Sequence, residues 1–134
     1  MDTALFLRSV AVWLAVASAE TLHGIARVRF LNPRVGDVRA RRIGVASGSL
    51  IILGIALVSA PWIAARGTLQ WLAVGLVWLA LMLAFDIGLG RWVFHLSWQR
   101  ISADFNPLEG GWLAAGMAFL AAAPLIAAKI LGLP

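Results

Sequence analysis

The chain has no cysteine and no tyrosine among its 134 residues. Without cysteine it can form no disulfide, no thiolate metal site and no cysteine nucleophile. Its seven tryptophans must therefore supply any aromatic belt at a membrane surface. Charged residues are also scarce, at 13% against about a quarter in soluble proteins, whereas 62% of the residues are hydrophobic. So few charges cannot cover a surface that faces water, and the composition predicts an integral membrane protein.

Four apolar runs are each long enough for a helix that crosses a bilayer, which needs about 20 residues. We expect one all-α domain over residues 1–134, with spans at about 5–25, 43–63, 69–89 and 110–131. Ala17-Ser18-Ala19 in the first run resembles a signal-peptide cleavage site, but the basic residues follow this run instead of preceding it. We therefore expect an uncleaved transmembrane helix.

Arginine is concentrated in the two segments that join these runs, which we expect to be inner loops over 26–42 and 90–109. The first contains six arginines against one acidic residue, Asp37, and the second adds Arg91 and Arg100. The remaining basic residues are Arg8, Arg66 and Lys129. Because basic residues favour the cytoplasmic side, both loops should lie inside and both termini in the periplasm of a bacterial inner membrane. The arginines would contact anionic lipid headgroups, and nothing here indicates nucleic acid.

The second loop also carries aromatic residues, so it is not plainly polar. Residues 91–101 mix tryptophan and phenylalanine with arginine and histidine. This mixture is typical of a short helix that lies in the headgroup layer. Its interfacial anchors would be Trp92, Trp98 and Arg100.

The candidate functional residues are the ionisable ones inside the apolar runs, since such residues are unfavourable in a membrane unless they are paired or face water. Glu20 and His23 lie one turn apart in the first run, and Asp86 lies at a similar depth in the third. Arg27 and Arg91 follow them in sequence and are the candidate charge partners. We expect the first and third helices to face each other with this polar cluster on the inner side.

Three interpretations of the cluster remain open. It can be a structural ion-pair network, a proton or cation site for transport, or a metal site. For a metal, Glu20 and His23 form the Glu-x-x-His pair of di-iron carboxylate proteins, but further ligands are needed. These would come from a second copy of the chain or from Asp86, Asp104 and Glu109. The two histidines could in principle also bind haem.

Two parts of the chain resemble a group of uncharacterised short four-helix bacterial inner-membrane proteins. The resemblance rests on Ala19–Gly24 with the Pro-Arg-x-Gly-Asp and Arg-Ala-Arg that follow, and on Gly90-Arg91 with Ser-Trp-x-Arg-Ile and Asp104. It implies a membrane protein of four helices and no activity. A looser likeness is to the small multidrug resistance exporters, which also have four helices and a glutamate in the first. This chain is longer, and its inner loops are more basic.

The sequence contains no Ser-His-Asp set and no glycine-rich phosphate loop, so we expect neither an enzyme nor a cofactor. We expect ion- or proton-linked transport of a small solute, by a homodimer because four short helices enclose little space. The alternative is an accessory or assembly subunit that packs on a larger membrane complex and transports nothing.

Overall fold

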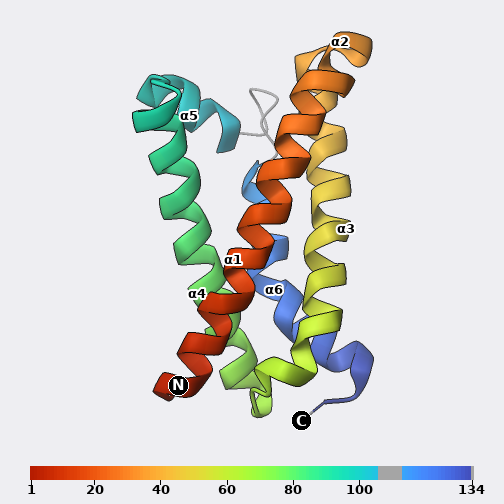
Figure 1. The fold of residues 1–134 in the computed structure, drawn as a ribbon, viewed down its shortest axis with the longest axis vertical. Coiled ribbons are helices and arrows are strands. Elements are labelled where there is room, and N and C mark those ends of the chain that lie inside the picture. The colour runs from red at the N-terminus through yellow and green to blue at the C-terminus, as the bar shows by residue number, and fades with distance from the viewer. Residues whose placement is uncertain (106–112, 134) are drawn as a thin grey trace.

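The computed structural model describes residues 1–105 and 113–133, which are helical apart from short turns. Four of the helices are long and apolar enough to cross a membrane. The two chain ends and the α3–α4 hairpin lie at one end of the bundle, here called the terminal end, as Figure 1 shows. Helices α2 and α5 lie at the opposite end, here called the arginine end. The expected placement of both termini together, opposite both long connections, is therefore observed.

The first span is longer than the sequence indicated. Helix α1 (Thr3–Ala26) continues without a break through the π-helix η1 (Arg27–Leu31) and the short α2 (Asn32–Val35). The chain turns at Gly36, whose φ of 87° is accessible to glycine without strain. Helix α3 (Asp37–Ile63) begins directly after it.

The predicted inner loop over 26–42 is thus wrong, because this segment is helical on both sides of Gly36. Its arginines, alanine and leucine are good helix formers. Pro33 lies in the first turn of α2, directly after η1, and has no N–H to donate to a carbonyl of the preceding turn. The basic composition correctly marked one end of the bundle but did not indicate a loop.

The second half of the chain contains α4 (Gly67–Gly88), the π-helix η2 (Leu89–Val93), α5 (Trp98–Phe105) and α6 (Leu113–Leu131). The predicted third span, 69–89, agrees with α4 to within two residues. The start of the predicted fourth span, residues 110–112, lies outside the described residues.

The short helix predicted over 91–101 was wrong in its bounds. The chain leaves the helix after Val93, and His95 adopts a left-handed φ of 56°. Helix α5 starts at Trp98, where the hydroxyl oxygen of Ser97 accepts a hydrogen bond from the Arg100 N–H at 3.1 Å. Serine is a favoured residue at this capping position. The helix in this segment exists, and its position at a membrane surface stays a prediction.

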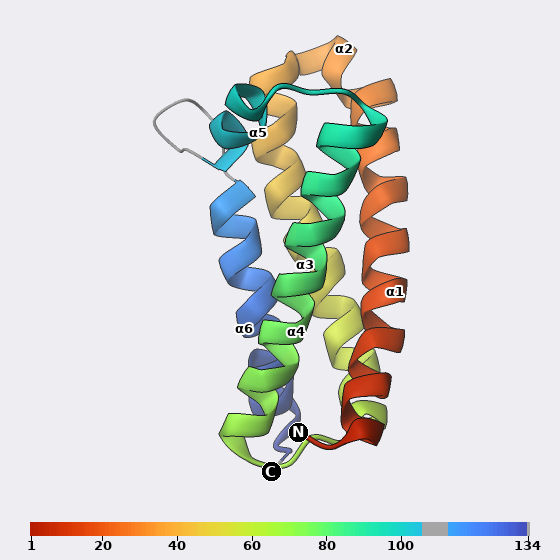
Figure 2. The same cartoon turned by 90° about the vertical axis from the view of Figure 1, so that its left-hand side faces the viewer.

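The four spans form a bundle in which α3 and α4 each pack against both α1 and α6. Figure 2 shows α6 on one side of the α3–α4 pair and α1 on the other. Helices α4 and α6 approach closely at Gly75, because a Cβ there would overlap the carbonyl oxygen of Ala121. Small residues allow this approach where helices cannot rely on the hydrophobic effect.

The tightest packing lies toward the terminal end. Trp71, Val74 and Trp78 of α4 are fully buried there, and the Trp78 indole N–H donates to the Ser9 carbonyl at 3.0 Å. Toward the arginine end the packing is looser. Among the described residues of α1, η1 and α2, none after Ala17 is buried. The polar cluster lies in this looser half.

Candidate functional site

Glu20 lies directly against helix α3 because Gly48 leaves room for it. A Cβ at Gly48 would be 2.8 Å from Oε2 of Glu20, and a Cβ at Gly44 would be 2.8 Å from Cδ of Arg27. Both glycines are buried. The Gly44-x-x-x-Gly48 motif therefore accommodates two long ionisable side chains, Glu20 of α1 on Gly48 and Arg27 of η1 on Gly44.

His23 is held one turn further along α1 by a hydrogen bond across to α3. Its Nε2 lies 2.6 Å from the hydroxyl of Ser47, which in turn lies 3.0 Å from the Ile43 carbonyl. A serine hydroxyl in a helix commonly donates to the carbonyl four residues earlier. We therefore assign the Ser47 proton to the Ile43 carbonyl and the His23 proton to Nε2, so that Nε2 donates to Ser47.

This tautomer turns an unprotonated nitrogen toward Glu20. Nδ1 of His23 lies 3.9 Å from Oε2 of Glu20. In a neutral imidazole with its proton on Nε2, Nδ1 is an acceptor, as is an ionised carboxylate. Two acceptors that face each other repel unless one of them carries a proton. The geometry thus provides a place for one additional proton on the Glu20–His23 pair.

Asp86 contributes the second carboxylate from α4. It lies close enough to Glu20 for the two groups to interact electrostatically. Among the described residues, neither carboxylate is within ion-pair distance of a lysine or arginine. Oε1 of Glu20 is buried and has no hydrogen-bond partner there. The two expected helices do bring their acidic residues within electrostatic reach of each other, and no lysine or arginine among the described residues forms an ion pair with either one.

Of the predicted charge partners, Arg27 lies near the cluster, within electrostatic reach of His23, whereas Arg91 lies in η2 and bonds locally. The guanidinium of Arg91 donates to the Leu96 carbonyl at 3.1 Å and stacks 5.2 Å from the ring centre of Trp98. The side chain of Arg27 covers Gly44, next to the turn that carries His23. The predicted interfacial anchors Trp92 and Trp98 are 71% and 53% exposed, and their place in a headgroup layer stays a prediction.

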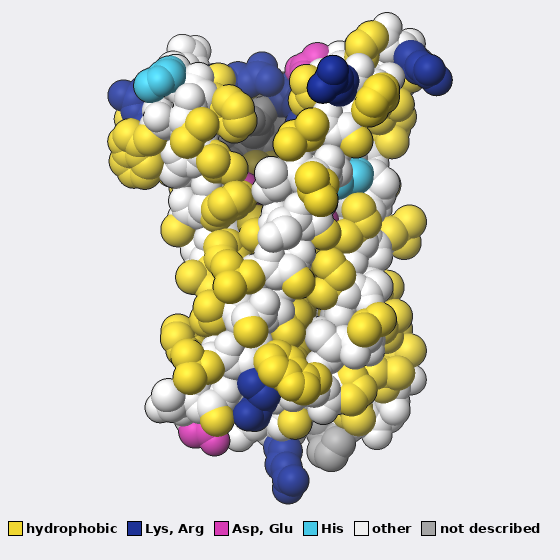
Figure 3. Space-filling model, viewed as in Figure 1, with side chains coloured by type: hydrophobic (Ala, Val, Ile, Leu, Met, Phe, Trp, Pro, Cys, Tyr) yellow, Lys and Arg dark blue, Asp and Glu magenta, His cyan; other side chains and the backbone are white. Residues whose placement is uncertain are grey.

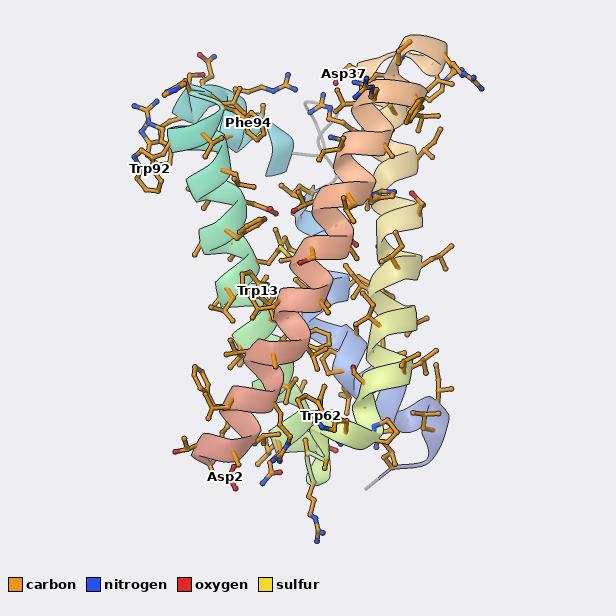
Figure 4. The ribbon with its side chains drawn as sticks, viewed as in Figure 1. Asp2, Trp13, Asp37, Trp62, Trp92 and Phe94 are labelled. Carbon is orange, nitrogen blue, oxygen red and sulfur yellow. The ribbon has the colours of Figure 1, made fainter. Side chains whose placement is uncertain are left out.

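An aromatic pair that packs against the buried core between α1 and α4 was missed in the sequence. Trp13 of α1 and Phe85 of α4 make an edge-to-face contact with ring centres 5.8 Å apart. Figure 4 shows Trp13 at mid-height between these helices. Trp13 is seven residues before Glu20, and Phe85 is adjacent to Asp86, so both aromatic rings lie toward the packed core. The heptad spacing of Trp13 and Glu20 was the available signal.

The role of Asp37 was also not revealed by the sequence. It accepts a hydrogen bond from Asn32 at 3.3 Å and pairs with Arg41 at 3.2 Å and Arg100 at 3.7 Å. Figure 4 shows it at the arginine end. Because Arg100 belongs to α5, Asp37 connects α5 to the start of α3 on that end.

The metal interpretation gains no support from the described residues. No group of three histidine or acidic side chains in that part of the chain is arranged to hold a metal ion. The candidate ligands Asp104 and Glu109 have side chains outside the described residues.

Comparison with known protein families, with curated proteins and with solved structures finds no match. The resemblance to small inner-membrane proteins therefore stays a prediction, and function is argued from the geometry alone.

Substitution of Gly48 tests the close contact between Glu20 and α3. A leucine there should displace Glu20 and separate α1 from α3, lowering the free energy of unfolding by about 1–3 kcal/mol, as overpacking commonly does. The matched control is Gly54→Leu, because a Cβ at Gly54 meets nothing within 4 Å. Both changes replace glycine by leucine within α3, so differences in helix propensity cancel. Equal stability of the two variants in detergent unfolding would contradict the packing described.

Proposed function

We propose that the four long helices span a bilayer with the arginine end in the cytoplasm of a bacterial inner membrane. Figure 3 shows charged side chains at the two ends of the molecule and hydrophobic side chains over the middle. Six arginines in Arg27–Arg42, with Arg91 and Arg100, belong to one end, against Arg8, Arg66 and Lys129 at the other. This asymmetry is the usual signal for a cytoplasmic location.

Reporter fusions test this orientation. A periplasm-active phosphatase fused after the last residue should be active, and the same enzyme inserted at Gly36 should be inactive. A fluorescent protein that folds only in the cytoplasm should give the reverse pattern. If the phosphatase is active at Gly36 and inactive at the C-terminus, the orientation is wrong.

We further propose that Glu20 and Asp86 take up and release a proton, and that this step is linked to transport of a small cationic solute. The supporting observation is that two carboxylates on facing helices lie together with no lysine or arginine paired to them in the described structure. An unpaired negative charge is strongly unfavourable inside a membrane. Such a pair of carboxylates is stable when it holds a proton or a cation. Replacement of the bound proton by a cation, and the reverse, is the basis of coupled transport.

The packing around the carboxylates favours access from the arginine end. Toward the terminal end, Trp78, Val74 and Val16 are fully buried and close the centre of the bundle. On the other side, the side chains of Glu20 and His23 are 24% and 20% exposed. A solute would therefore enter from the cytoplasmic side in this conformation, and release on the far side would need the terminal half to open. The expected homodimer stays a prediction.

The variant Glu20→Gln separates this function from a purely structural role. Glutamine keeps the size of glutamate but cannot exchange a proton. We expect the variant to unfold within about 1 kcal/mol of the wild type, because no buried ion pair is broken; breaking one commonly costs about 3–5 kcal/mol. We also expect it to abolish proton movement in liposomes with an internal pH dye, driven by gradients of sodium, potassium or tetramethylammonium.

The control variant is Asp37→Asn, which removes a carboxylate at the arginine end outside the cluster and should leave proton movement intact. Absence of cation-driven proton movement by the wild type, together with strong destabilisation by Glu20→Gln, would contradict the proposal and favour a structural cluster.

A further inference from the structure

A groove between α1 and α3 runs along the apolar surface of the terminal half. It has a volume of about 480 Å³ and is lined mainly by small or aliphatic side chains, with Trp62 at one end. Its polar residue, Ser59, is satisfied internally, since its hydroxyl donates to the Ile55 carbonyl at 2.6 Å. Gly54 adds open space, because a Cβ there would meet no atom within 4 Å. The groove is therefore apolar and free of unmet hydrogen bonds.

A cationic group lies beside the end of the groove that is nearest the terminal end. Nε of Arg8 donates to the carbonyl of Ile63 at 2.9 Å, which holds the guanidinium next to Trp62. The two terminal nitrogens of Arg8 have no hydrogen-bond acceptor among the described residues. Trp62 is 56% exposed, and Figure 4 shows it between α1 and α3 near the terminal end. Tryptophan beside arginine is typical of the headgroup layer of a membrane.

We propose that this groove binds one acyl chain of an anionic phospholipid, with the lipid phosphate at Arg8. The inference rests on the proposed membrane insertion but not on the proton site. Arginine matches phosphate with paired hydrogen bonds, and the apolar groove continues from it in the direction of the bilayer centre.

Charge distinguishes a lipid from a second copy of the chain as the occupant. A second copy that docked through the same groove would bring its own Arg8 toward the Arg8 beside the groove. The described acidic residue at this end, Asp2, already caps its own helix by accepting a hydrogen bond from the Leu5 N–H at 2.7 Å. An anionic headgroup supplies the negative charge that no other acidic side chain among the described residues offers at this end.

Native mass spectrometry of delipidated protein, titrated with phosphatidylglycerol or with phosphatidylcholine of the same chains, tests the site. The wild type should bind one phosphatidylglycerol molecule more tightly than phosphatidylcholine. Gly54→Leu should fill the groove and weaken both lipids. Arg8→Gln should weaken phosphatidylglycerol by about fivefold, which is the usual contribution of one basic residue near an anionic surface, and phosphatidylcholine by less, because its choline offsets the charge of its phosphate.

Matched controls are available for both substitutions. Gly24→Leu adds the same side chain at a helical glycine of α1 that also has open space and lies outside the groove. Arg66→Gln removes a charge at the same end but on the α3–α4 hairpin. Neither control should change lipid binding. Equal binding of the two lipids, no effect of Gly54→Leu, or a dimer that Gly54→Leu converts to a monomer would each overturn the proposal.

Discussion

The arrangement of the arginine half depends on one contact, the Glu20 carboxylate against Gly48 of α3. The glycine lets a carboxylate lie at a helix interface, where Oε2 would be 2.8 Å from any Cβ and Oε1 is buried without a partner. Any larger residue at position 48 would move the carboxylate away from His23 and Asp86. In a membrane such a group needs a proton or a cation, since no lysine or arginine among the described residues pairs with it. The proposed function follows from this requirement.

The two halves of the bundle differ because their interfaces contain different residues. In the terminal half, Trp71 and Trp78 fill the interior, and Gly75 allows α4 to touch the backbone of α6. In the arginine half, the contacts between described elements include polar ones, such as His23 to Ser47 and Asp37 to Arg100 of α5. Polar contacts of this kind rearrange more readily than a close-packed core. The half that carries the ionisable groups is therefore also the half better suited to move.

Apolar run length was sufficient to find the four long helices, because about 20 apolar residues have few other stable arrangements. The bounds were less predictable: arginine-rich sequence is compatible with both helix and loop, and Gly36 alone marks the turn. The meeting of Glu20 with Asp86 followed from their similar depth on two spans. The positions of Arg91 and Arg100 could not be predicted in this way. They depend on the local fold around Ser97 and on the ion pair with Asp37, and neither Ser97 nor Asp37 is adjacent to the carboxylates in sequence. Predicting the contact between Trp13 and Phe85 requires knowing how far the two parallel helices α1 and α4 are shifted along each other. The periodicity of residues within one helix does not give that shift.

The most direct test of the account asks whether the carboxylate pair holds a proton. Infrared spectroscopy of the protein in lipid, at neutral pH and without small inorganic cations, distinguishes a protonated carboxyl group from an ionised carboxylate. We expect a protonated carboxyl band that shifts in heavy water and is lost or altered in both Glu20→Gln and Asp86→Asn, but not in Asp37→Asn. Two fully ionised carboxylates under these conditions would contradict it.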